Sequence, residues 1–262
     1  MPACQITTAP RLLVVLALAV GCTREAPAES EPLVVFAASS TADAFRELAS
    51  AFEEEHPDTP VELAFAGSQT LRLQLEHGAP ADIIATANEA HIRSLADAGV
   101  VRGAVPFAEN RLVVIVPKEN PSGLAAFEDL PNANRVVVGL PSVPLGAYTE
   151  QLFERGAGVW GATSSARLRR HVVSKEANAR LVRAKVELGE ADAAVVYATD
   201  ARGRPEVDVI PVPEALNVTA LYFTARVDRP ESHPQAGAWI DFLRTERARG
   251  ILGRHGFQTH GD

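Results

Sequence analysis

Small and hydroxyl-bearing residues recur where apolar segments of this 262-residue chain end. The stretches with this character are residues 35–40, 65–68, 143–146, 178–180 and 195–200. Each lies where a predicted strand gives way to a loop or helix, or where a helix begins, and backbone N–H groups are unpaired at such places. None of them contains a nucleophile–base pair or a cluster of metal ligands. The pattern predicts a protein that binds a tetrahedral dianion through neutral donors and does not transform it.

Each stretch also has an ordinary structural explanation when it is taken alone. Ser40 and Ser68 would serve as helix caps, residues 144–146 as a rigid turn, and residues 178–180 as the first turn of a helix. Tyr197 would be a core tyrosine whose hydroxyl is satisfied. However, the two serine turns follow adjacent strands of a predicted parallel sheet, and the glycine before Ser68 lets the backbone approach a ligand closely. Their recurrence favours a shared binding role.

The elements that must position these stretches alternate between strands and helices. Strands are predicted at 33–37, 61–65 and 82–86, and helices at 42–55, 67–77 and 92–98. The first helix carries Phe45, Leu48, Ala49 and Phe52 on one stripe. This β-α-β order predicts a parallel sheet with right-handed crossovers.

A second set of α/β elements follows the first. Strands are predicted at 111–116, 135–139, 171–173, 192–197, 207–212 and 218–224, and helices at 147–155, 177–188, 235–247 and 251–255. Two successive sets with a returning tail predict an α/β protein of two lobes, with residues 33–108 plus 215–262 in lobe 1 and residues 109–214 in lobe 2. Ligands of such sheets lie beyond the carboxyl ends of the strands, so we expect a ligand cleft between the lobes.

The N-terminal segment has the features of an export signal. Arg11 precedes an unbroken apolar run at residues 12–20, which is shorter than the about 20 residues that span a bilayer. Small residues then lead to Cys22 in a pattern that resembles a bacterial lipobox. We therefore predict a lipoprotein signal peptide at 1–21, lipidation of Cys22 and a flexible tether at 22–32, which would hold the body outside the cytoplasm, in the periplasm, on a bacterial membrane. The alternative is an ordinary signal peptide with an incidental cysteine.

Charge and cysteine content exclude several classes of protein. The formal net charge is −8, which argues against nucleic acid as a partner. Since Cys4 lies in the predicted signal peptide, a chain that begins at Cys22 has no internal disulfide and no cysteine metal site. Because the acidic body does not attract anions from a distance, an anion must be held by local dipoles.

The body resembles the periplasmic molybdate-binding proteins of ABC importers, the ModA family. The resemblance rests on residues 35–40, 65–68, 78–82, 144–148 and 189–200 in this order and spacing, and it covers nearly all of the chain from residue 33. It implies the type II periplasmic-binding-protein fold, with a mainly parallel sheet and flanking helices in each lobe. It also implies that the oxyanion is held by Ser40, Ser68, Leu145, Ala179 and Tyr197, with Ser39 as a further donor. Leu145 and Ala179 depart from the family's usual residues, but both would act through the backbone N–H.

The resemblance implies a binding protein that delivers molybdate, and tungstate with it, to an ABC permease and its ATPase. It implies no cofactor, no direct metal ligands and a monomer. The chemistry of the residues agrees, because molybdate and tungstate are fully deprotonated at neutral pH and need only donors. Phosphate still carries a proton and would favour an aspartate or glutamate acceptor, and the matched set contains neither. Selection against sulfate must then come from the size of the cavity.

Other classes of function remain open from the residues alone. An enzyme is disfavoured because the chain has no Gly-x-Ser-x-Gly, Ser-x-x-Lys or HExxH motif. A protein of the same fold could bind sulfate, ferric ion or an organic anion, although only three tyrosines are present for a ferric site. Arg180 could pair with an organic carboxylate. A lipid-anchored scaffold without a small ligand is the remaining alternative.

Overall fold

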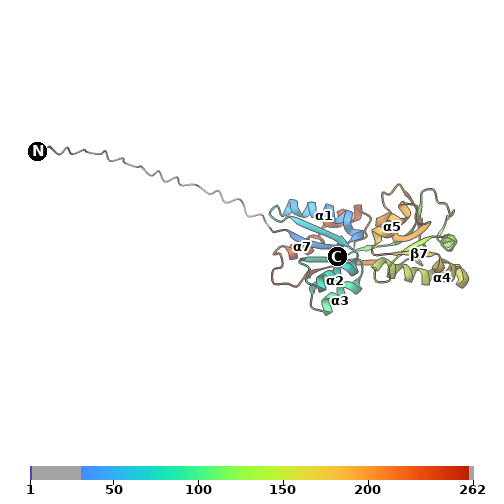
Figure 1. Cartoon of the computed structure of the whole chain (residues 1–262), viewed down its shortest axis with the longest axis horizontal. Coiled ribbons are helices and arrows are strands. Elements are labelled where there is room, and N and C mark those ends of the chain that lie inside the picture. The colour runs from blue at the N-terminus through green and yellow to red at the C-terminus, as the bar shows by residue number, and fades with distance from the viewer. Residues whose placement is uncertain (2–30, 260–262) are drawn as a thin grey trace.

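The computed structural model describes Met1 and residues 31–259. The strands of these residues form two five-stranded sheets. Figure 1 shows two groups of elements side by side, one made of the early blue-to-teal and final red parts of the chain, the other of its middle part. The predicted α/β fold with two lobes is confirmed.

The first sheet has the strand order β2-β1-β3-β10-β4. Its strands are β1 (Leu33–Ala38), β2 (Val61–Ala66), β3 (Ile83–Thr86), β4 (Val101–Asn110) and β10 (Ala220–Val227). The first three are parallel to one another, whereas β10 is antiparallel to both β3 and β4. The carboxyl ends of β1 and β2 are adjacent, with Ala38 opposite Ala66 in the register.

Helices cover both faces of this sheet. They are α1 (Ala42–Glu55), α2 (Ser68–Glu76), α3 (Glu89–Asp97), α7 (Ala236–Phe242) and α8 (Glu246–Arg254). On one face Phe52 of α1 packs edge-on against Trp239 of α7, with ring centroids 5.2 Å apart. On the other face Leu71 and Ile92 belong to a separate apolar cluster, and Figure 1 shows α1 on the opposite side from α2 and α3. Burial of these apolar faces stabilises the lobe.

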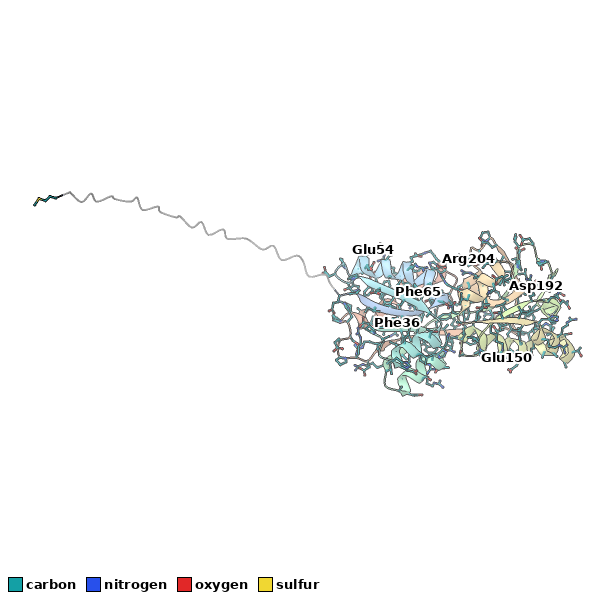
Figure 2. All side chains as sticks on the ribbon, viewed as in Figure 1. Phe36, Glu54, Phe65, Glu150, Asp192 and Arg204 are labelled. Carbon is teal, nitrogen blue, oxygen red and sulfur yellow. The ribbon has the colours of Figure 1, made fainter. Side chains whose placement is uncertain are left out.

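The second sheet has the strand order β7-β6-β8-β5-β9. Its strands are β5 (Leu112–Pro117), β6 (Val136–Gly139), β7 (Val172–Glu176), β8 (Ala193–Tyr197) and β9 (Val207–Pro211), and its helical elements are η2 (Phe127–Asn132), α4 (Pro144–Arg170), α5 (Ala179–Glu187) and α6 (Ala198–Ala201). β6 is parallel to β7 and β8, whereas β5 is antiparallel to β8 and β9. Figure 2 places Glu150 and Asp192 in this second lobe, and Phe36 and Phe65 in the first.

The chain crosses between the sheets from β4 to β5 and from β9 to β10. Asn217 joins the two crossings, because its Oδ1 accepts from Leu112 N at 3.0 Å and its Nδ2 donates to Leu112 O at 2.9 Å. The bonded segments are 105 residues apart in sequence. This pairing holds the two crossings side by side.

Strand β4 was not predicted. Gly103, with a φ of +67°, and Pro106 interrupt its apolar pattern. Proline is tolerated there because β4 is an edge strand, where a missing backbone donor costs little. The strand therefore depends on its pairing with β10 and not on a local signal.

Two helix predictions were wrong in extent. The helix expected at 147–155 begins at Pro144 and reaches Arg170, with a break at Gly161, whose φ of +73° lies in the left-handed region. The helix expected at 235–247 is divided into α7 and α8. Thr245 makes the division, because its side chain accepts from Ala248 N at 3.2 Å and caps α8.

The predicted signal peptide, Cys22 and the tether up to residue 30 lie outside the described residues. Among residues 31–259, no helix is both long enough and apolar enough to cross a bilayer. The division into residues 33–108 plus 215–262 and residues 109–214 remains a prediction.

Candidate oxyanion-binding site

A small cavity lies where the carboxyl ends of strands from both sheets meet. Its lining residues are Ala38, Ser39, Ser40, Ala66, Gly67, Ser68 and Ala87 from the first lobe, and Val143, Pro144, Leu145, Asn178, Ala179 and Tyr197 from the second. All five residues predicted to hold an oxyanion, and Ser39 as well, line this single cavity. Segments more than a hundred residues apart in sequence are thus brought together.

Ser40 reaches the cavity from a short 3-10 turn, η1 (Ser39–Thr41), that follows β1 directly. Thr41 Oγ1 donates to Ala38 O at 2.8 Å and fixes the turn. The Ser40 hydroxyl lies 2.9 Å from the hydroxyl of Tyr222 in β10. Since either oxygen can be the donor, Tyr222 can supply the proton of that bond and leave the Ser40 proton for a ligand.

Ser68 is the first residue of α2, and Gly67 is its N-cap. Ser68 Oγ accepts from Ala87 N at 3.1 Å, which leaves its O–H free to donate. Gly67 cannot be replaced without cost, because a Cβ there would lie 2.5 Å from Ala177 O in the second lobe. The turn therefore brings a hydroxyl and unpaired helix N–H groups to the cavity, in close contact with the opposite lobe.

Leu145 occupies the first turn of α4, next to Pro144 at the start of the helix. Its side chain is fully buried and belongs to the hydrophobic core, so the side chain adds no polar group to the cavity. The turn is close-packed, because a Cβ on Gly146 would lie 2.1 Å from Leu140 O. Thr149 Oγ1 donates to Leu145 O at 2.7 Å and further fixes the segment.

Ala179 is the first residue of α5, after the N-cap Asn178. The Asn178 side chain accepts from Leu181 N at 3.1 Å, which is the usual N-cap bond. The N–H of the first helical residue has no intrahelical partner and adds to the positive end of the helix dipole. Ala179 therefore lines the cavity with a backbone N–H that has no intrahelical partner.

Tyr197 ends β8 and is 1% exposed. Within residues 31–259 its hydroxyl has no hydrogen-bond partner of standard geometry, although the neighbouring Tyr222 hydroxyl is close enough to affect its pKa. Burial, together with the neighbouring tyrosines and Asp200, raises the pKa of Tyr197 well above its usual value. The hydroxyl is thus a neutral donor, and a buried donor without a partner is costly unless a ligand satisfies it.

The lining of the cavity carries no charged side chain among the described residues. The described part of the chain also has no group of three histidine, cysteine or acidic side chains that could hold a metal ion. Arg180, the candidate partner for an organic carboxylate, is engaged elsewhere: its Nε donates to Ser39 O at 2.9 Å and its Nη2 lies 2.7 Å from Asp43. The arrangement can bind an anion by hydrogen bonds alone.

Sequence reasoning missed the supporting residues of this site. Tyr222 was expected only as part of a strand, and Ala87 was not singled out, yet both bond a serine of the cavity. A lone tyrosine in a strand carries no signal of this role, because its contact with Ser40 depends on the pairing of β10 with β3.

Two mixed sheets with a shared cavity between them define a two-lobed solute-binding protein. The chain belongs to the family of bacterial extracellular solute-binding proteins, which it matches over residues 33–258. It is 34% identical over 250 residues to the molybdate-binding protein ModA of Mycobacterium tuberculosis H37Rv, covering 91% of this chain and 92% of that protein. The resemblance predicted from the sequence is thereby confirmed.

More distant relatives agree with this assignment. A putative ABC transporter substrate-binding lipoprotein, YvgL of Bacillus subtilis strain 168, is 27% identical over 248 residues, covering 92% of this chain and 93% of the relative. The solved periplasmic molybdate-binding protein of Azotobacter vinelandii superposes with a TM-score of 0.74 at 16% identity, covering 87% of this chain and 99% of that one. This structural likeness establishes the shared fold.

Proposed function

We propose that this protein captures molybdate, and tungstate with it, outside the cytoplasm for an ABC importer. The observation that carries the proposal is the cavity itself, which gathers hydroxyl and helix-start N–H donors from both lobes and is lined by no charged side chain of the described residues. The relatives named molybdate-binding proteins support the choice of cargo.

The donors have distinct roles in the proposed site. Ser40 and Ser68 donate their hydroxyl protons from the first lobe, with Ser39 beside them. Leu145 and Ala179 donate backbone N–H groups from the second lobe, and Tyr197 donates its buried hydroxyl. Hydrogen bonds to a charged group contribute about 1.5–3 kcal/mol each, so this set is sufficient for tight binding after the ordering costs are met.

The absence of a carboxylate from the proposed ligand set selects among tetrahedral anions. A fully deprotonated dianion is satisfied by donors alone. A protonated phosphate also carries an O–H, for which a carboxylate would be the strongest acceptor, and the proposed set contains no carboxylate. Sulfate has the same charge as molybdate and a smaller radius, so discrimination between them depends on the fit of the cavity. An organic carboxylate is disfavoured because the Arg180 guanidinium is already bonded to Ser39 O and Asp43.

The wider biological assignment follows from the same proposal. The family is extracellular, and we propose that lipidation of Cys22 and a tether at 22–32 hold the body on a bacterial membrane after loss of residues 1–21. We further propose that the protein is a monomer without catalytic activity and that it delivers its cargo to a permease with its ATPase. Lobe 1 would comprise residues 33–108 plus 215–262, and lobe 2 residues 109–214.

Capture would operate as a shift between open and closed arrangements of the lobes. An anion that bonds groups of both lobes binds the closed arrangement better than the open one, and so increases the closed population. Small-angle scattering of the saturated protein should show a smaller radius of gyration than that of the free protein. An unchanged radius would contradict this mechanism.

Calorimetric titration of the purified protein with molybdate, tungstate, sulfate and phosphate tests the function. We expect one-to-one binding of molybdate and tungstate that is at least a hundredfold tighter than that of sulfate, a difference of about 2.8 kcal/mol. Tight binding of sulfate alone would keep the fold and change the cargo. Binding of none of the four anions would contradict the proposal and favour a scaffold role.

A further inference from the structure

The residues that follow two of the proposed anion donors both reach into the opposite lobe. Gln69 follows Ser68, and its Nε2 donates to Ala177 O at 2.8 Å. Arg180 follows Ala179, and its Nε donates to Ser39 O at 2.9 Å. Both acceptors are close in sequence to a proposed donor of their own lobe. Ala177 is two residues before Ala179, and Ser39 directly precedes Ser40.

Two ion pairs extend the Arg180 contact. Arg180 Nη2 lies 2.7 Å from Asp43 Oδ1, and Arg204 Nη2 lies 2.9 Å from Asp43 Oδ2. Asp43 stands in the first turn of α1 in the first lobe, whereas Arg180 and Arg204 belong to the second. We call Gln69, Arg180, Asp43 and Arg204 the interlobe network.

Charge and burial support the network at neutral pH. Partial burial raises the pKa of Asp43, but the hydrogen bond and charge of Arg180, with the charges of Arg204 and Arg46, outweigh it and hold the pKa below its usual value. Isolated exposed ion pairs contribute little. Here, however, one carboxylate meets two arginines of the opposite lobe, and Arg180 is also bonded to a backbone carbonyl, so several contacts act together.

Close packing at Gly67 shows that the lobes meet tightly at this place. A Cβ on Gly67 would lie 2.5 Å from Ala177 O, the same carbonyl that accepts from Gln69. Neither Gln69 nor Arg180 lines the cavity. The two residues therefore join the lobes next to lining residues of the proposed anion site without belonging to its lining.

We propose that Arg180 and Gln69 are positioning residues of the anion site, which hold the donors of the two lobes in register by bonds that do not touch the anion. This inference rests on the proposed function. Because the bonds exist only while the lobes are in contact, they should stabilise the loaded protein and slow release of the anion. They should do so equally for every anion that the cavity accepts.

The test compares Arg180→Ala and Gln69→Ala with a matched control, Arg46→Ala. Arg46 also pairs with Asp43, at 3.1 Å, but from within the first lobe, so its loss leaves every interlobe bond in place. We expect Arg180→Ala to raise the Kd for molybdate at least tenfold, about 1.4 kcal/mol, mainly through faster dissociation in stopped-flow measurements. Gln69→Ala should raise it severalfold, and Arg46→Ala less than twofold.

The effect of an interlobe bond should not depend on which of the two anions is bound. The Arg180→Ala change should raise the Kd values for molybdate and tungstate by the same factor. A Kd for Arg180→Ala within twofold of the control would overturn the proposal, as would an unchanged dissociation rate, because bonds that exist only between lobes in contact act by slowing release.

A separate readout keeps this inference distinct from the choice of cargo. If the unaltered protein binds none of the tested anions, the proposed function fails, and the network is then judged by small-angle scattering without anion. A larger radius of gyration for Arg180→Ala than for Arg46→Ala would support the interlobe role. Equal radii would overturn it.

Discussion

The hydroxyl oxygens of Ser40 and Tyr222 lie 2.9 Å apart and join a turn near the start of the body to a strand 182 residues later. Tyr222 is fully buried, and burial, with the charge of Asp200 nearby, raises the pKa of its hydroxyl well above the usual value. A neutral Tyr222 that donates to Ser40 directs the Ser40 proton into the cavity. Strand β10, which the chain enters after it leaves the second lobe, thus orients Ser40, a proposed donor of the first lobe.

Replacing Tyr222 with phenylalanine should weaken anion binding without abolishing it. The change removes one neutral hydrogen bond, which contributes about 0.5–1.5 kcal/mol, so the Kd for molybdate should rise about threefold to tenfold. Calorimetric titration measures it. An unchanged Kd, with the variant still folded by circular dichroism, would show that Ser40 does not depend on Tyr222.

Replacing Tyr197 with phenylalanine should have a larger effect. The Tyr197 hydroxyl is buried without a standard hydrogen-bond partner among the described residues. A hydrogen bond to a charged anion contributes about 1.5–3 kcal/mol. Its loss should therefore weaken the affinity for molybdate by about tenfold to a hundredfold. The control is Tyr148→Phe. The centroid of the Tyr148 ring lies 6.5 Å from that of the Tyr197 ring, but Tyr148 does not line the cavity. If the two variants lose the same affinity, the proposed role of Tyr197 is wrong.

Gly146 should be essential for stability, whereas Gly158 in the same helix should not. A Cβ on Gly146 would lie 2.1 Å from Leu140 O and 2.5 Å from Gly139 O, while a Cβ on Gly158 meets nothing within 4 Å. Gly146→Ala should therefore lower the free energy of unfolding by about 1–3 kcal/mol through overpacking. Gly158→Ala should raise it by up to about 1 kcal/mol, because alanine favours helix. Denaturant titration measures both, and equal effects would contradict the close contact at Gly146.

Asp200 should make the free energy of unfolding depend on pH. Burial raises its pKa to about 7, against the opposing charge of Arg183, whereas the usual value is 3.8. Between about pH 4 and pH 7 the folded protein retains a proton that the unfolded chain releases, so stability falls as the pH rises through this window and is level above it.

The variant Asp200→Asn isolates this effect. It cannot lose that proton, so the difference in unfolding free energy between the variant and the unaltered protein should change in favour of the variant from pH 5 to pH 8. Other titrating groups are common to both proteins and cancel. Parallel denaturant titrations at pH 5, 6, 7 and 8 measure the difference, and a constant difference would contradict the raised pKa.

The stretches that line the cavity could be predicted because they stand at local signals, whereas the individual donors proposed in them come from the resemblance to the molybdate-binding family. Ser40 and Ser68 follow apolar strands, and Ala179 follows an asparagine that caps a helix. Such positions expose N–H groups whatever the tertiary structure. The order of strands and helices then placed them at one end of each sheet.

The rest of the site could not be predicted because it depends on contacts between distant segments. The bond from Gln69 to Ala177 spans 108 residues, and that from Arg180 to Ser39 spans 141. Neither partner carries a local pattern. Strand β4 was missed for the same reason, since its pairing with β10 overrides the glycine and proline in its sequence.

The most direct test of the central claim is anomalous diffraction from crystals of the protein grown with molybdate, measured above and below the molybdenum absorption edge. We predict one strong anomalous peak in the cavity between the lobes, surrounded by Ser40, Ser68, Leu145, Ala179 and Tyr197. The molybdate oxygens around this peak should lie within hydrogen-bond distance of Tyr197 Oη and Ser68 Oγ. If the cavity has no such peak at saturating molybdate, or if molybdenum is found only elsewhere on the protein, the cavity is not the molybdate site.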